Sequence, residues 1–161
     1  MSSFLLIGFF ALAGGKRLPS VNPTSASKTW HSHYDSTLQC LSNTLLPTRI
    51  RIYSRIHDPV FPDDTLAFVG GKCVVTADSE VLIDAYFVQP VPGNCTDEDY
   101  QDHCPDFPFP LVTALGQVLP HTTTPATDSP IKIFSLSVKD YVRDSVKATT
   151  LQYFFLSFLL L

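Results

Sequence analysis

Side chains that could bind a charged ligand recur at every second position between Thr48 and His57. Four of them are cationic or aromatic: Arg49, Arg51, Tyr53 and Arg55. Because side chains alternate across a strand, these four share one face at a spacing of about 6.5–7 Å, and isoleucines fill the other. Guanidinium groups neutralise phosphates and a tyrosine ring stacks on a base, so the face suits a single-stranded nucleic acid. Lys72, on the next predicted strand, extends the set.

Two other interpretations of this arginine face stay open. It is an ordinary solvated strand face, or its cations pair with acids on neighbouring strands such as Asp84; alternatively it meets a protein or another polyanion. The chain has 15 acidic and 11 basic residues, a net charge of −4. That balance excludes a strongly basic nucleic-acid binder of the usual kind.

An acidic cluster lies in the long connection 94–110. Its members have no Lys or Arg beside them: Asp97, Glu98, Asp99, Asp102 and Asp106. Oxygen-rich loops hold Ca²⁺, but the EF-hand spacing and its glycine are absent. Solvation and a helix cap explain the acids, so we predict no metal and no cofactor. The segment could also fold over the arginine face as an intramolecular competitor.

The four cysteines contain no C-x₂-C pair, which disfavours a zinc site. In a secreted chain, Cys95 and Cys104 form the expected disulfide, and Asn94-Cys95-Thr96 is a formal glycosylation sequon. Cys73 on a strand face is expected to be a small buried apolar residue.

Catalytic motifs are missing from the sequence. There is no G-x-S-x-G, no glycine-rich phosphate loop and no H-E-x-x-H. His57 and Asp58 are adjacent and would point to opposite faces of a strand, while His31 and His33 fall in a segment that we expect to be flexible. The sequence therefore predicts a protein that is not an enzyme.

Turn residues divide the body of the chain into short apolar runs. The six predicted strands are 48–57, 66–76, 81–88, 111–119, 131–138 and 149–156, with Gly70-Gly71 marking a bulge. Thr96 and Asp99 resemble a capping box for one short helix between strands 3 and 4. This order predicts an all-β fold, a small Greek-key barrel or sandwich of OB-like type with five to six strands.

Charge divides the chain near Pro47: residues 1–47 carry +2 and residues 48–161 carry −6. We therefore expect a flexible arm over 1–47, an OB-like barrel over 48–156 and an apolar tail over 157–161. Residues 1–13 are apolar and signal-like, but no Lys or Arg precedes the run, so a cleaved signal stays open. The run is too short for an integral membrane span. An intracellular location is slightly favoured over secretion.

Several short strings resemble one family of proteins: Arg55-Ile56-His57-Asp58-Pro59, Phe61–Val69, Pro90-Val91-Pro92-Gly93, Tyr100-Gln101-Asp102-His103 and Val138–Asp144. Together they are similar to an uncharacterised family of small OB-like barrel proteins from mushroom-forming (basidiomycete) fungi. The resemblance covers about residues 48–153. It implies the barrel and brings no activity or site residue with it.

The sequence as a whole thus predicts a non-enzymatic binding module. Its expected partner is single-stranded DNA or RNA, held by Arg49, Arg51, Tyr53, Arg55 and Lys72. The alternative is a secreted, disulfide-stapled β-domain that interacts with another protein or a surface.

Overall fold

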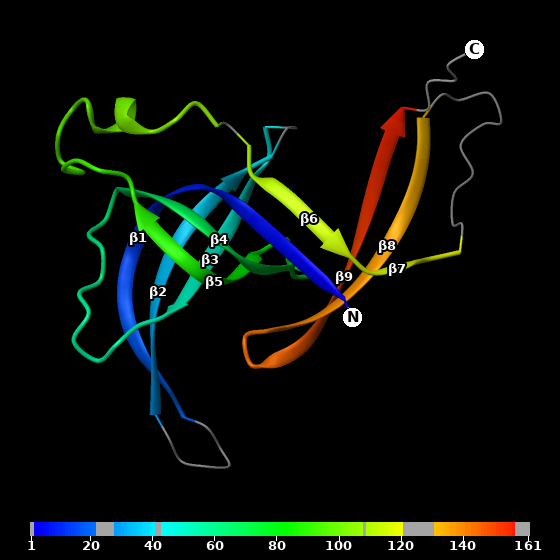
Figure 1. The fold of residues 1–161 in the computed structure, drawn as a ribbon, viewed down its shortest axis with the longest axis horizontal. Coiled ribbons are helices and arrows are strands. Elements are labelled where there is room, and N and C mark those ends of the chain that lie inside the picture. The colour runs from blue at the N-terminus through cyan, green and yellow to red at the C-terminus, as the bar shows by residue number, and fades with distance from the viewer. Residues whose placement is uncertain (1, 22–27, 41–42, 108, 121–130, 157–161) are drawn as a thin grey trace.

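The computed structural model describes residues 2–21, 28–40, 43–107, 109–120 and 131–156 (Figure 1). These residues form an almost wholly β structure, as the sequence predicts. The strands in chain order are β1 (Ser3–Val21), β2 (Lys28–Gln39), β3 (Leu45–Tyr53), β4 (Thr65–Val75), β5 (Val81–Pro90), β6 (Leu111–Leu115), β7 (Gln117–Val118), β8 (Ile131–Val142) and β9 (Ser145–Leu156). No helix in the described part of the chain has the length and apolarity needed to cross a membrane.

Strands β1 to β5 close into a barrel because β1 is shared between two partners. Its first part pairs with β4 over Leu5–Leu12, and its second part pairs with β2 over Ala13–Val21. The order is β2-β3-β5-β4-β1, with β1 returning to β2. Only β3 and β5 run parallel among these barrel pairs. This closed order is that of an OB-type Greek-key barrel, so the predicted fold class is confirmed.

The predicted flexible arm over 1–47 is wrong, because β1 and β2 are two of the five barrel strands. Phe4, Leu6 and Phe10 point into the core, and the odd-numbered residues that alternate with them lie on the outer face. The outer residues Leu5, Ile7 and Phe9 are apolar too, which hides the alternation of a strand in the sequence. Residues 3–13 of the signal-like run 1–13 are therefore the first part of β1, and the five barrel strands lie between Ser3 and Pro90 instead of within 48–156.

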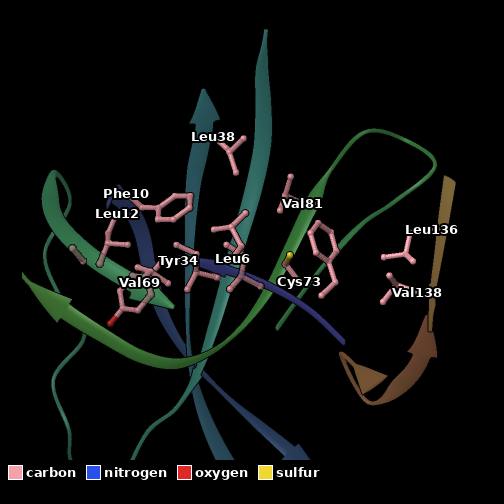
Figure 2. Close-up of a cluster of buried hydrophobic side chains, with 14 residues drawn as sticks. Leu6, Phe10, Leu12, Tyr34, Leu38, Val69, Cys73, Val81, Leu136 and Val138 are labelled. Atoms are coloured by element: carbon pink, nitrogen blue, oxygen red, sulfur yellow. The ribbon is translucent and has the colours of Figure 1, made fainter. Parts of the chain in front are cut away.

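The core combines inward side chains of the barrel with two from β8 (Figure 2). Its most completely buried members include Leu12, Ile50, Val69, Cys73, Val81 and Ile83. Leu136 and Val138 project from β8 toward this cluster and join it. Each fully buried aliphatic side chain contributes about 2 kcal/mol through removal from water. The β8–β9 hairpin is thus attached to the barrel by apolar contacts as well as by the charges described below.

Outside the barrel, β6 adds to the edge of β1, and β7, β8 and β9 form a second, three-stranded sheet. The predicted strand over 111–119 is split at Gly116, where a Cβ would lie 2.4 Å from the Ser137 carbonyl oxygen. The predicted bulge at Gly70-Gly71 is confirmed by a shift in the β4–β5 register. The tail over 157–161 lies outside the described residues.

The predicted helix is a single 3-10 turn, η1 (Tyr100–His103), between β5 and β6. The turn begins at Tyr100 with Asp99 as its N-cap, so Thr96 does not cap it and the predicted capping box of Thr96 and Asp99 is wrong. Instead, the Asn94 amide donates to the Asp97 carboxylate and the Asn94 side-chain oxygen accepts from the Thr96 N–H. These contacts are a local turn, which the same residue types favour equally.

Candidate functional site

The outer face of β2, β3 and β5 carries the residues that the sequence singles out. Paired residues of neighbouring strands share a face. The register places His33, Arg51 and Asp84 in one row and His31 beside Tyr53 in the next. Lys72 continues the first row on β4, opposite Asp84. The predicted arginine face is therefore part of a wider outer face to which β2 also contributes.

Arg51 lies in the covered part of this face. Its Nε and one terminal nitrogen donate to the two carboxylate oxygens of Asp84, each at 2.8 Å. Its other terminal nitrogen donates to Asp144 at 2.6 Å. The Arg51 side chain is only 10% exposed. A guanidinium held by a bidentate pair and a second carboxylate is a structural group, so Arg51 is not open to a phosphate.

The carboxylate of Asp144 comes from the turn between β8 and β9. Arg143 and Asp144 form its two-residue loop, and both have positive φ, 54° and 65°. This is the pattern of a type I′ turn, which usually takes Asn or Gly at these positions. Here the Arg143 N–H donates to Asp84 at 2.8 Å, and its side chain donates to the Arg49 carbonyl oxygen at 2.8 Å. Contacts to the barrel thus hold a turn that its own residues disfavour.

Lys72 is the second predicted binding residue that is already paired. Its ammonium group donates to Asp140 on β8 at 2.7 Å, which raises the pKa of Lys72. The interpretation of the face as cations paired with acids is therefore right for Arg51 and Lys72. Asp84 and the β8–β9 hairpin supply these acids, in place of the acidic segment 97–106.

Tyr53 and Arg49 lie in the open part of the face. The Tyr53 ring is 65% exposed, and its centroid is 6.4 Å from the His31 ring in an edge-on arrangement. Arg49 pairs with Glu80 at 2.7 Å, but its side chain is 64% exposed. An exposed pair of this kind contributes little, so the Arg49 guanidinium can exchange Glu80 for a phosphate. These residues can stack on a ring and neutralise an anion.

Arg55 is exposed but does not continue the strand, because β3 ends at Tyr53. Its backbone N–H donates to the carboxylate of Asp58 at 2.7 Å in the following turn. The predicted strand over 48–57 is therefore too long by its last four residues, and Ile56 is 54% exposed instead of facing inward. Arg55 lies at the rim of the open face.

The surroundings of the outer face lower the pKa values of two histidines on β2, His31 and His33. Burial, followed by the charges of Arg143 and Arg51, lowers the pKa of His33 to about 4. Burial and the charge of Arg51 also lower the pKa of His31. Both rings are therefore uncharged at neutral pH. Sequence reasoning missed them as parts of this face because β2 was assigned to the flexible arm; the signal for β2 is its alternation of buried Ser32 and Tyr34 with these histidines.

Within the described residues, no three His, Cys, Asp or Glu side chains are grouped so as to hold a metal ion. Cys95 and Cys104 are free thiols, and the disulfide of the secreted alternative stays a prediction. Burial raises the pKa of the Cys73 thiol to about 12, and its side chain is in the core, so the prediction for Cys73 is confirmed.

Comparison with solved structures finds similar chains. One of them is a deletion mutant (delta 228–252, R190A) of the single-stranded DNA binding protein from Thermus aquaticus, at 15% identity and a TM-score of 0.48. The match covers 96% of this chain and 75% of the other. No family model and no curated protein matches, so the resemblance to the fungal family stays a prediction. The OB-like assignment follows from strand order and register alone.

Proposed function

We propose that this chain is a non-enzymatic binding module that takes single-stranded DNA or RNA on the outer face of β2 and β3. One observation supports the proposal most strongly. In an OB-type barrel, the β2–β3 face is the usual ligand surface, and Tyr53 stands 65% exposed on that face at the end of β3. A large aromatic ring exposed there, with His31 beside it, offers a stacking platform for bases.

The phosphates would be neutralised by the cations around this platform. Arg49 lies four residues before Tyr53 on the same face, and Arg55 lies two residues after Tyr53, beyond the end of β3. Lys16 is exposed on β1 in the row of His33. The proposal no longer includes Arg51 and Lys72 as ligand contacts, because carboxylates already hold them. A few phosphate contacts predict modest affinity with a moderate salt dependence.

Fluorescence anisotropy of labelled dT15 and U15 with the full chain, at two salt concentrations, tests the proposal. We expect binding that weakens as salt rises. Tyr53→Ala should weaken binding about tenfold, since one stacked base contributes about 1–3 kcal/mol. Arg49→Glu should weaken it about as much, because it replaces a cation near the phosphates with an anion. Tyr141→Ala is the matched control, because Tyr141 on β8 is also well exposed, at 56%, but lies off this face. Absence of binding at low salt, where electrostatic attraction is strongest, would contradict the proposal.

A further inference from the structure

Below Tyr53, the open end of the barrel contains a pocket of about 290 Å³. It lies between the inward faces of β2, β3 and β5 and the segment 54–64 that leaves β3. Mouths of β-barrels are frequent ligand sites, and the volume is close to the lower end of the usual range for small-molecule pockets. Tyr53 lines the pocket and also stands on the outer face, so the two are continuous.

The walls of this pocket are apolar, but its lining includes buried hydroxyl groups. Ile52, Phe61 and Val88 form much of the wall. Ser32 and Tyr34 line it as well, although they are only 3% and 2% exposed. Buried hydroxyls at this end contrast with the aliphatic residues of the rest of the core. Burying a hydroxyl costs free energy unless it has a hydrogen-bond partner.

Ser32 is the clearest of these groups. No hydrogen bond of its hydroxyl is found among the residues that the structure describes. The Tyr34 hydroxyl accepts from the Phe61 N–H at 3.1 Å and keeps its own proton to donate. Ser32 therefore offers a hydroxyl that can donate or accept, and Tyr34 offers one that can donate. The lining also includes the Ser54 hydroxyl and the exposed Asp58, whose carboxylate accepts from a backbone N–H. A hydrocarbon ligand would leave the Ser32 and Tyr34 hydroxyls unsatisfied, whereas a flat heterocycle with carbonyl and N–H groups would not.

A cation lies at the rim of the pocket. Arg17 donates from Nε to the Ser54 hydroxyl at 3.1 Å and from a terminal nitrogen to the Ile56 carbonyl oxygen. Ser54 lines the pocket, so the guanidinium of Arg17 is close to any group that leaves it. A base inside the pocket would have its phosphate near this cation.

From these contacts we infer that the pocket binds a single nucleobase, turned inward past Tyr53 from a strand on the outer face. This inference rests on the proposed function and adds base recognition to it. Stacking on Tyr53 tolerates any base, whereas Ser32 and Tyr34 contact the hydrogen-bonding edge of the one that enters. The neighbouring phosphates remain on the outer face with Arg49.

The test compares dT15 with an abasic strand of the same length and charge. Filling the pocket by Ser32→Leu from β2, or by Val88→Phe from β5, should reduce affinity for dT15 about fivefold, the loss of part of one base contact. Affinity for the abasic strand should not change. Ser32→Ala keeps the pocket open but removes one hydrogen bond to the base, so it should weaken binding of dT15 about threefold and leave the abasic strand unchanged. Tyr141→Ala is the control that should leave both affinities unchanged. Two fillings from different strands guard against a variant that fails to fold, which thermal melting monitors.

The outcomes separate this inference from the proposed function. If both filled variants bind dT15 like wild type while Tyr53→Ala weakens binding, the pocket inference is overturned and the proposed function stands. If wild type does not bind dT15, the proposed function fails, and NMR titration with thymidine monophosphate decides on the pocket. Amide shifts around Ser32 and Phe61 that disappear in Ser32→Leu would uphold it; no shifts would overturn it.

Discussion

Arg49 and Arg51 lie two residues apart on the same face of β3, yet they are in opposite situations. Arg51 is covered by the β8–β9 turn and held by Asp84 and Asp144. The Arg49 side chain is 64% exposed and pairs with Glu80. Strand periodicity places both on one face, but the hairpin added after the barrel decides which of them is open. The covered part of this face, around Arg51, therefore stabilises the fold, whereas the open part, around Arg49 and Tyr53, can bind a ligand.

The largest effect that this comparison predicts is on stability. Arg51→Met should lower the free energy of unfolding by about 3 kcal/mol, because it leaves the carboxylates of Asp84 and Asp144 without this partner. Arg49→Met should cost no more than about 1 kcal/mol, since its pair with Glu80 is exposed. Urea denaturation of both variants measures the difference. Equal losses would show that the covered and open parts are not distinct.

Lys72→Met tests whether the Lys72–Asp140 pair belongs to the covered part of the face, which stabilises the fold. Asp140 is only 9% exposed on its side chain, so removal of Lys72 leaves a poorly solvated carboxylate. We expect a loss of about 2 kcal/mol at pH 7. Burial raises the pKa of Asp140, but the hydrogen bond from Lys72 and other contacts outweigh it, so the pKa of Asp140 lies below its usual value. The contribution of the pair is therefore present above pH 4 and falls as pH decreases further, and pH-dependent melting of both proteins checks this.

His33 gives a smaller effect with a different pH range. Its pKa of about 4 in the folded chain lies below the ordinary 6.5, so the unfolded chain takes up this proton first. Stability should therefore decrease as pH falls from about 6.5 to about 4. His33→Gln removes this dependence, because glutamine does not titrate. If the melting temperature of His33→Gln depends on pH across that range as steeply as that of wild type, His33 does not have the lowered pKa that its burial implies.

The smallest expected effect on stability belongs to the open part. Tyr53→Ala should change the free energy of unfolding by about 0.5 kcal/mol or less, because exposed side chains contribute little. Chemical denaturation measures this change. A loss above about 2 kcal/mol would mean that Tyr53 supports the barrel, and its place as a free stacking surface would be wrong.

Much of the fold follows from the sequence, because turn residues separate runs with clear alternation. Strands β4, β5, β8 and β9 lie close to their predicted positions, and Gly70-Gly71 forms the predicted bulge. Strand β1 could not be recognised in the same way, since both of its faces are apolar near its start. Its outer residues are covered by neighbours, for example Phe9 by Phe68, with ring centroids 5.0 Å apart.

The candidate site was predicted less completely, for a reason that Arg51 makes clear. Local sequence shows which residues share a strand face but not which distant element covers that face. Asp144 is 93 residues away from Arg51 in the chain. The sequence did indicate Asp84 as a partner. It did not indicate where the hairpin packs on the barrel. That position covers Arg51 and leaves Arg49 exposed.

The most direct test of the open part as the binding surface is the affinity of dT15 at low salt for three proteins: wild type, Tyr53→Ala and Tyr141→Ala. The account predicts binding by wild type, an unchanged affinity for Tyr141→Ala, and a loss of about tenfold for Tyr53→Ala with its fold intact. Equal affinities for all three proteins, or no binding by any of them, would contradict it.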